Sequence, residues 1–502
     1  MKTETKIRKN IVSGFVYQIL TLLLGITIPR LVLVNLGSET NGLLSSVNQV
    51  LVYLALFEGG MGLSITQSLY GPIAKHEYDE INGIMSAANI FYKHVGLCYF
   101  VGLLVIATIY PLTVTSSLES VEIFAVAILS GLPQVINFFF QGKYRTLISV
   151  NGKGYVLTNL NTVVAIGSNI CKIILLISGL GVVALQTMYC ALSLIQMIFI
   201  IWYVKKEFPW LNIKVKPAKE KIGQRSSVFL HQISGFIFSN TDAILLTYFC
   251  DLKMVSVYSL YSTFFSMIGG MISNITGSLV FAMGQKFNSD REGYLRVQNI
   301  FETVNMVLVF SCYSVLCLCI LPFLKIYTFG ITDTEYIYLK LPYFFAVIQL
   351  LQAGRFSSQK VIEYAGEFRN TQWHSACEAI INIVVSVVCV IKFDIYGVLM
   401  GTIAALLFRS VAMIYYACKR ILHTKQSAVY RKWSINVILF IVLQILGQKI
   451  GITPASYLGV ILYAAILMLI TLLLFGFAGI LYDKESFDDV VSQLKMRIKV
   501  GG

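Results

Sequence analysis

Long runs of apolar residues, separated by short polar segments, follow one another from Ile11 almost to Tyr482. A helix that crosses a bilayer needs about 20 predominantly apolar residues, and a transmembrane barrel would instead alternate apolar and polar residues over segments of about ten. The pattern therefore predicts an all-α polytopic membrane protein with about 14 transmembrane helices. The predicted spans are 11–34, 42–68, 84–111, 119–141, 153–178, 181–204, 227–249, 255–282, 298–325, 337–362, 374–392, 395–418, 434–450 and 456–481.

Composition excludes a soluble globular protein. Of the 502 residues 57% are hydrophobic and 13% charged, with a mean hydropathy of +0.75, whereas soluble domains carry about 25% charged residues. Most of the ten cysteines lie inside apolar runs without metal-type spacing, so they are expected to be small core residues. The sequence predicts no metal site and no cofactor.

The basic residues indicate the orientation. In the fourteen-span arrangement, 29 of the 39 Lys and Arg residues fall in the termini and the even-numbered loops, and only five fall in the opposite loops. By the positive-inside rule both termini are cytoplasmic. The net charge of +14 is explained by these loops, so nucleic acid is not an expected partner. The first apolar run has no small-residue cleavage site after it and is expected to be an uncleaved helix.

Two halves of the chain share short matches. A basic linker with Pro209 and Pro217 follows the sixth span, and Ser13-Gly14-Phe15 and Gly181-Val182 recur beyond it as Ser234-Gly235-Phe236 and Gly397-Val398. Their common order predicts two parallel six-helix lobes around a central cavity, for which a monomer is sufficient. The predicted division is an N-lobe 1–204, a basic cytoplasmic linker 205–226, a C-lobe 227–418, a cytoplasmic loop 419–433, two extra helices 434–481 and a cytoplasmic tail 482–502.

Five basic residues lie more than three residues inside a predicted span, where an ionisable group is costly and is therefore a functional candidate. They are Arg30, Lys93, Lys172, Arg355 and Arg409. Arg30, Lys172 and Lys93 lie near span ends, so snorkelling to the membrane surface is an alternative explanation. Arg409 is flanked by apolar residues, which favours a cavity or a buried partner.

Acidic residues and amides also occur in the spans. Asp242 is the deepest carboxylate, suited to coupling protons or sodium or to pairing with a buried arginine. Glu58 precedes Gly59-Gly60-Met61-Gly62, whose glycines permit close packing or a bent helix. Three further glutamates near cytoplasmic ends are expected to be hydrated: Glu302, Glu363 and Glu378. Amides suit sugar hydroxyls as well as helix-to-helix hydrogen bonds, and the spans contain many: Asn137, Asn159, Asn161, Asn169, Asn274, Asn305, Asn382, Gln134, Gln196, Gln349 and Gln352.

No catalytic constellation emerges, so the chain is not expected to be an enzyme. There is no Gly-x4-Gly-Lys-Ser/Thr loop, no Gly-x-Ser-x-Gly elbow and no pair of histidines at metal-ligand spacing. The loops also leave no room for a soluble catalytic domain.

Several segments, spread over residues 11 to about 420, resemble the polysaccharide-transporter branch, the O-antigen or capsule repeat-unit flippases, of the multidrug/oligosaccharidyl-lipid/polysaccharide exporter superfamily. They are Thr27-Ile28-Pro29-Arg30, Phe57-Glu58-Gly59-Gly60-Met61-Gly62-Leu63-Ser64, Asn240-Thr241-Asp242 and Ile395-Tyr396-Gly397-Val398-Leu399-Met400-Gly401-Thr402. Glu58 departs from the pattern, since many members have Asp there.

The resemblance implies a flippase that moves undecaprenyl-diphosphate-linked oligosaccharide across the bacterial cytoplasmic membrane by alternating access. A diphosphate needs Arg or Lys along a low-dielectric path, so Arg30, Arg355, Arg409, Lys93 and Lys172 are the predicted anion path. Asp242 and Glu58 are the predicted coupling or counter-ion residues. Expected partners are the lipid-linked oligosaccharide, membrane lipids, H+ or Na+, and a polysaccharide polymerase with glycosyltransferases.

Two rivals within the superfamily remain open. A multidrug cation antiporter would favour net negative charge in its cavity and usually has twelve helices, whereas here the intramembrane cations are prominent. A peptidoglycan lipid-precursor flippase also has fourteen helices and is expected to carry several cations in its first lobe, where only Arg30, Lys93 and Lys172 are available.

Overall fold

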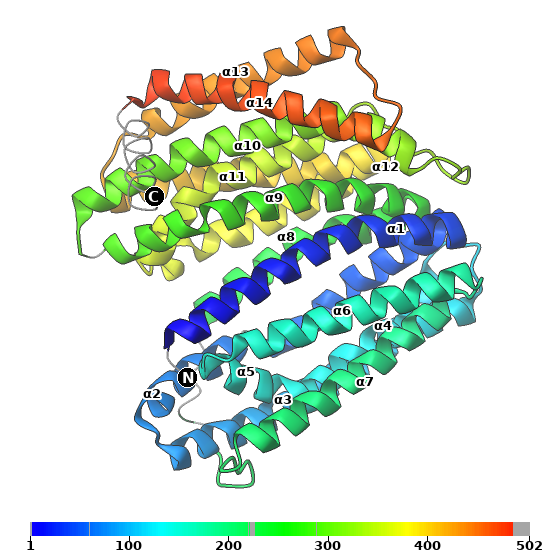
Figure 1. The fold of residues 1–502 in the computed structure, drawn as a ribbon, viewed down its shortest axis with the longest axis vertical. Helices are drawn as coiled ribbons and strands as arrows, with labels where there is room; N and C mark the ends of the chain where they lie inside the picture. The colour runs from blue at the N-terminus through cyan, green and yellow to red at the C-terminus, as the bar shows by residue number, and fades with distance from the viewer. Residues whose placement is uncertain (1–2, 60, 219, 221–225, 288, 485–502) are drawn as a thin grey trace. The chain divides into compact units, whose positions relative to one another are not determined.

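The computed structural model describes residues 3–59, 61–218, 220, 226–287 and 289–484, and the regular structure of these residues is entirely helical. Parts of two predicted segments lie outside the described residues, namely 219 and 221–225 of the basic linker and 485–502 of the tail, as do residues 1–2, 60 and 288. The chain divides into two compact units, Met1–Ser256 and Val257–Gly502, which are described one at a time (Figure 1).

The helices follow the predicted order. The first unit holds α1 (Thr3–Ala55), η1 (Leu56–Glu58), α2 (Met61–Lys75), α3 (Tyr78–Thr113), α4 (Ser120–Ile136), the π-helical segment η2 (Asn137–Gln141), α5 (Gly142–Val150), α6 (Gly154–Ile177), α7 (Val182–Glu207) and α8 (Ser226–Phe249). From α9 (Leu252–Lys286) the chain enters the second unit, with α10 (Arg291–Tyr327), α11 (Leu341–Tyr364), α12 (Phe368–Tyr416), the π-helical segment η4 (Ala417–Leu422), α13 (Gln426–Ile450) and α14 (Tyr457–Tyr482).

Two of the longest helices are each broken at one residue. Within α1, Gly37 has φ 83°, which glycine adopts without steric cost. Within α12, Asp394 has φ 46° and ψ −128°. Each break produces two successive helical segments, so all fourteen predicted spans have a helical counterpart. Ten helices of the described chain are long and apolar enough to cross a membrane, and the prediction of an all-helical multi-span membrane protein is confirmed.

The two segments of α12 fold back on each other as a tight hairpin. Asn382 donates to Thr402 Oγ1 at 3.0 Å, and Ser386 Oγ donates to the carbonyl of Val398 at 3.1 Å. A Cβ on Gly397 would overlap the backbone of Cys389, and one on Gly401 would overlap Ser386. The glycine spacing of four residues therefore lets the two segments approach closely.

The C-terminal part of α1 packs against α8 and the start of α9 through small polar contacts. Asn41 Nδ2 donates to Ser256 Oγ at 2.7 Å, and Ser46 Oγ lies 2.5 Å from Thr247 Oγ1. Tyr110 of α3 donates to Ser46 Oγ at 2.7 Å. These buried hydroxyl and amide pairs satisfy one another inside the first unit.

Replacing Gly42 by alanine is expected to destabilise the protein by about 1–3 kcal/mol, because the new Cβ would overlap the backbone carbonyl of Leu252, which cannot rotate away. Gly167→Ala is the matched control, since no atom lies within 4 Å of its Cβ position. Alanine also favours the helix more than glycine does. Thermal unfolding of the purified variants measures both effects, and equal melting temperatures would contradict the proposed close contact.

The described part of the basic linker folds onto the N-terminal end of α3. Asn82 accepts from the N–H of Asn212 at 2.9 Å, Ser86 Oγ donates to the carbonyl of Val215 at 2.7 Å, and the Ala218 N–H donates to the carbonyl of Gly83 at 3.0 Å. The segment after α7 is therefore fastened to the first unit by backbone and side-chain hydrogen bonds.

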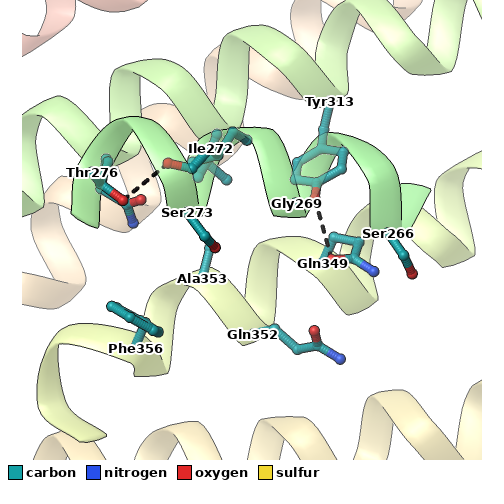
Figure 2. A pocket seen from close by; sticks show the side chains of 12 residues that line it. Ser266, Gly269, Ile272, Ser273, Thr276, Tyr313, Gln349, Gln352, Ala353 and Phe356 are labelled. Atoms are coloured by element: carbon teal, nitrogen blue, oxygen red, sulfur yellow. Dashed lines mark hydrogen bonds between the residues drawn. The ribbon is translucent and has the colours of Figure 1, made fainter. Parts of the chain in front are cut away.

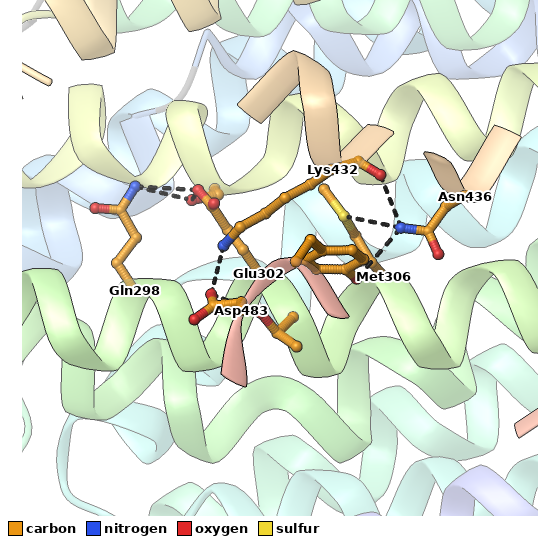
Figure 3. A network of polar contacts seen from close by, with 9 residues as sticks. Gln298, Glu302, Met306, Lys432, Asn436 and Asp483 are labelled. Carbon is orange, nitrogen blue, oxygen red and sulfur yellow. Dashed lines mark hydrogen bonds and ion pairs between the residues drawn. The ribbon is translucent and has the colours of Figure 1, made fainter. Parts of the chain in front are cut away.

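In the second unit, α13 and α14 are fastened to α10 by a buried polar network (Figure 3). Lys432 Nζ lies 2.7 Å from Asp483 Oδ2, and Thr303 Oγ1 of α10 donates to the same oxygen at 3.1 Å. Asn436 Nδ2 donates to the Tyr482 hydroxyl at 3.2 Å. The Lys432 side chain is only 7% exposed, so Asp483 is the counter-charge of a buried ammonium group.

Asp483→Ala is expected to destabilise the protein by about 2 kcal/mol, because it leaves the Lys432 ammonium buried without a counter-charge. The double variant Lys432→Met/Asp483→Leu is expected to recover most of the loss, since apolar residues can replace a buried ion pair. Melting temperatures of the two variants test this. A double variant that melts as low as Asp483→Ala would show that the charges themselves are not the cause.

Candidate functional site

A cavity of about 700 Å³ lies inside the first unit. Residues from α1, α3, α4, η2, α5, α6, α7 and α8 line it. A volume in this range suits a ligand of drug size or larger. The lining is rich in amides, which can both donate to and accept from hydroxyl groups: Asn48, Gln134, Asn137, Gln141, Asn161, Asn169 and Gln196.

One wall is a polar stripe that continues from α4 through η2 into α5. Gln134, Asn137, Gln141 and Arg145 all line the cavity, at spacings of three, four and four residues. Such spacing keeps side chains on one face of a helix. Pro133 removes a backbone donor at the beginning of the stripe, and the π-helical turn follows directly. Local π turns of this kind are frequent at functional sites.

Arg145 is the cation of this wall. Its Nε donates to Gln141 Oε1 at 3.1 Å, and Gln141 Nε2 donates in turn to the carbonyl of Ser193 at 3.4 Å. Within the described chain, Arg145 has no ion pair with a carboxylate. Gln141 therefore orients the Arg145 guanidinium. The terminal N–H groups of Arg145 remain available to an anion in the cavity.

Further lining residues come from α6 and α7. Gln196 Nε2 donates to Asn161 Oδ1 at 2.8 Å, which fixes both amides. Lys172 lies one turn beyond Asn169, and its ammonium sits 5.7 Å from the ring centroid of Tyr189, a lining residue. Tyr189 is also within electrostatic range of Arg145. Lys172, a predicted anion-path residue, thus borders the cavity without being among its described lining residues.

The electrostatic character of the cavity follows from its lining. None of the described lining residues is an aspartate or a glutamate, and Arg145 is charged. In a low-dielectric surrounding, an uncompensated cation attracts an anion strongly. The arrangement suits a ligand that carries both negative charge and many hydroxyl groups.

Arg355 and Arg409, two other predicted anion-path residues, share one carboxylate in the second unit. Arg355 Nη1 is paired with Glu378 Oε1, and Arg409 Nε lies 3.6 Å from Glu378 Oε2. The Arg409 and Glu378 side chains are 5% and 6% exposed. The expectation that Glu378 is hydrated is wrong: it is the buried counter-ion of two arginines. Glu302, at 9% exposed, is also buried and accepts from Ser357 Oγ at 2.9 Å.

The remaining predicted cations lie outside the lining described above. Arg30 is half-buried in α1, and Lys93 is exposed on α3. Lys93 is close to Lys143, whose ammonium reaches Asn89 Oδ1 at 2.5 Å. A role for Arg30 and Lys93 on an anion path stays a prediction.

The predicted acidic residues also have identifiable neighbours. Glu58 accepts from the Tyr92 hydroxyl at 3.1 Å and from the backbone N–H of Gly62 at the beginning of α2. A Cβ on Gly62 would come within 2.5 Å of the Glu58 carboxylate, so this glycine permits close packing. Asp242 is 4% exposed and lies near Tyr53, whose hydroxyl is 2.7 Å from Thr241 Oγ1. Ion coupling by either carboxylate stays a prediction.

Arg145 is the functional candidate that sequence reasoning misses. The predicted fourth span ends at residue 141, which assigns Arg145 to a cytoplasmic loop, but the helix continues to Val150. The signal is the polar stripe itself, because a loop residue has no reason to continue the spacing of Gln134, Asn137 and Gln141.

A second, smaller cavity of about 260 Å³ lies in the second unit between α9, α10 and α11 (Figure 2). Its described lining contains amides, hydroxyls and one phenol but no aspartate, glutamate, lysine, arginine or histidine. Within the described chain, no group of histidine, cysteine and carboxylate side chains is arranged to hold a metal ion.

Comparison with known proteins yields matches by structure only. No family model matches the chain, and no curated protein matches it. The structure of the lipid II flippase MurJ in an inward closed conformation matches with a TM-score of 0.70 at 13% identity, covering 94% of this chain and 98% of that one.

Two transporters of the MOP superfamily also match. An inward-facing multidrug resistance MATE family transporter matches with a TM-score of 0.65 at 13% identity, over 82% of this chain and 96% of that one. A transporter from Pyrococcus furiosus, described as having a binding pocket of reversed polarity, matches with a TM-score of 0.58 at 12% identity, over 86% and 97% of the two chains. The chain has the fold of these membrane transporters.

Proposed function

We propose that the chain is a transporter of the MOP superfamily that flips undecaprenyl-diphosphate-linked oligosaccharide repeat units across the bacterial cytoplasmic membrane, for O-antigen or capsule synthesis. The observation that carries this proposal is the amide-rich cavity of the first unit with Arg145 as its cation. The shared fold with a lipid II flippase supports the same class of substrate.

The geometry suggests how each part of the substrate is handled. Arg145, oriented by Gln141, donates its terminal N–H groups to the diphosphate. Lys172, beside Tyr189, supplies a second positive charge at the border of the cavity. The amides of α4, α6 and α7 hydrogen-bond sugar hydroxyls, while the lipid tail stays in the bilayer. Movement between the two membrane faces follows by alternating access.

The charge of the cavity argues against a multidrug cation antiporter. An organic cation would meet Arg145, with no described carboxylate in the lining to offset the repulsion. The peptidoglycan lipid-precursor flippase remains the second candidate, because the match to the lipid II flippase covers 94% of this chain. Both candidates transport a polyprenyl diphosphate, and they differ in the sugars attached to it.

Orientation and partners belong to the same proposal. The distribution of basic residues supports a cytoplasmic location for both termini. The chain would then receive its substrate from cytoplasmic glycosyltransferases and release it to a polymerase at the outer face. Arg30, Arg355, Arg409 and Lys93 are proposed as further anion-path residues, with Glu58 and Asp242 as coupling or counter-ion residues for H+ or Na+.

Reconstitution into liposomes tests this function. The purified protein is expected to move a fluorescently labelled, polyprenyl-diphosphate-linked oligosaccharide between leaflets and not to take up ethidium, a typical organic cation. Protein-free liposomes provide the background rate. Uptake of ethidium without movement of the lipid would overturn the flippase and favour the antiporter.

A further inference from the structure

The smaller cavity, called here the α9–α11 pocket, is lined by uncharged polar groups from three helices (Figure 2). Ser266 and Ser273 come from α9, Asn305 and Tyr313 from α10, and Gln349 and Gln352 from α11. Ile272, Val309 and Phe356 add apolar surface. This mixture of hydroxyls, amides and apolar side chains offers both hydrogen bonds and contact for C–H groups.

Asn305 shows that the α9–α11 pocket has unused hydrogen-bonding capacity. Its side chain is only 8% exposed and lines the pocket, yet within the described chain it has no hydrogen-bond partner. Buried amides are normally hydrogen-bonded, because an unsatisfied polar group costs free energy. An amide held in this way inside a cavity is suited to a polar ligand.

The neighbouring polar groups are also only partly used. Tyr313 donates its hydroxyl proton to Gln349 Oε1 at 3.2 Å, and the N–H groups of Gln349, a lining residue, have no partner within the described chain. Figure 2 shows this Tyr313 to Gln349 contact at one end of the pocket. Gln352 has no partner within the described chain. Donors and acceptors from α10 and α11 therefore converge on one space.

The α9–α11 pocket has no charge with which to bind an ion. Arg355, which lies between Gln352 and Phe356 in sequence, is paired with Glu378 and is not among the described lining residues. An anionic ligand would lose its hydration without gaining a counter-ion, and so would a cation. The volume of about 260 Å³ is also smaller than that of sites for drug-sized ligands.

We infer that the α9–α11 pocket binds an uncharged sugar ring. Its amides and hydroxyls receive the ring hydroxyls, and Phe356 with Val309 contacts the apolar face of the ring. This inference rests on the proposed function and extends it, since it assigns an uncharged sugar of the oligosaccharide to the α9–α11 pocket of the second unit.

Binding to the purified full-length protein tests the assignment with two probes. The first probe is undecaprenyl diphosphate, which has no sugar, and the second is the lipid-linked oligosaccharide that accumulates in cells depleted of this protein. Dissociation constants are measured for the wild type, Asn305→Ala, Asn305→Ala/Gln352→Ala and the control Gln448→Ala. Gln448 is an exposed amide of α13 that contacts the Tyr343 hydroxyl outside the pocket.

The wild type is expected to bind the sugar-bearing lipid more tightly than undecaprenyl diphosphate. Asn305→Ala should weaken binding of the sugar-bearing lipid about fivefold and the double variant about 25-fold, as loss of one and two hydrogen bonds predicts. Binding of undecaprenyl diphosphate should not change in either variant, and Gln448→Ala should behave as the wild type with both probes. Truncating Asn305 leaves no partner unsatisfied within the described chain, so the variants are expected to fold.

Four outcomes would overturn the inference. Equal affinity of the wild type for the two probes would show that sugars contribute nothing, while the proposed function stands. Variants that bind the sugar-bearing lipid as the wild type does, or that lose affinity for both probes equally, would exclude sugar binding at the α9–α11 pocket. A wild type that binds neither probe would remove the proposed function and this inference with it.

Discussion

Replacing Arg145 by alanine is expected to lower transport of the lipid-linked oligosaccharide about a hundredfold. A hydrogen bond to a charged group contributes about 1.5–3 kcal/mol. The two terminal nitrogens of the Arg145 guanidinium can make two such bonds to a phosphate. Arg145→Lys keeps the charge but not the planar geometry, so a loss of about tenfold is expected. Initial transport rates in liposomes at subsaturating substrate measure both variants.

Arg369→Ala is the matched control, because Arg369 is exposed on α12 and outside both described cavities. Its transport rate should equal that of the wild type. Melting temperatures of all variants separate loss of function from loss of fold. Normal transport by folded Arg145→Ala would contradict the placement of the diphosphate beside Arg145, and so would an equal loss in the Arg369 variant.

Replacing Glu378 by glutamine is expected to destabilise the protein by about 3–5 kcal/mol, because it leaves the buried Arg409 guanidinium, 5% exposed, and the less deeply buried Arg355 guanidinium, 16% exposed, without their shared counter-ion. The destabilisation is expected to affect the packing of α11 against the α12 hairpin. Arg355 comes from α11, Glu378 from the first segment of α12 and Arg409 from its second segment. A large fall in the melting temperature and in the yield of monodisperse protein is the expected result.

Two further variants test whether the buried charges cause the destabilisation expected for Glu378→Gln. Glu363→Gln removes the partner of Lys360 in a partly exposed pair, 23% and 28% exposed, and should cost less than about 1 kcal/mol. Replacing the whole triad by Arg355→Met/Glu378→Leu/Arg409→Met should restore much of the stability, because no buried charge remains. A Glu378→Gln variant as stable as Glu363→Gln would contradict the buried triad.

Hydropathy predicts most of the fold because the bilayer permits few alternatives. A lipid-exposed backbone must satisfy its own hydrogen bonds, so long apolar runs become helices. The break at Gly37 lies between the predicted spans 11–34 and 42–68. The break at Asp394 lies between the predicted spans 374–392 and 395–418. The close hairpin of α12 follows from Gly397 and Gly401, whose spacing is visible in the sequence.

The candidate site is less predictable, because side-chain partners are not encoded in hydropathy. A window average falls where Gln141, Lys143 and Arg145 follow one another, so the continuing helix is taken for a loop. Arg355 and Arg409 are predicted anion-path residues, and the sequence gives no sign that both also pair with Glu378. That pairing depends on how α11 packs against the α12 hairpin, and the sequence alone does not show this packing.

The central claim, that the chain flips a lipid-linked oligosaccharide, is tested most directly by mass spectrometry of undecaprenyl-linked intermediates after conditional depletion of the protein, with surface polysaccharide assayed in the same cells. The account predicts that complete repeat units accumulate on the lipid while surface polymer disappears. The sugars found on the accumulated lipid distinguish a repeat-unit flippase from a peptidoglycan-precursor flippase. Unchanged lipid intermediates and unchanged polymer, with altered sensitivity to cationic drugs, would contradict the account.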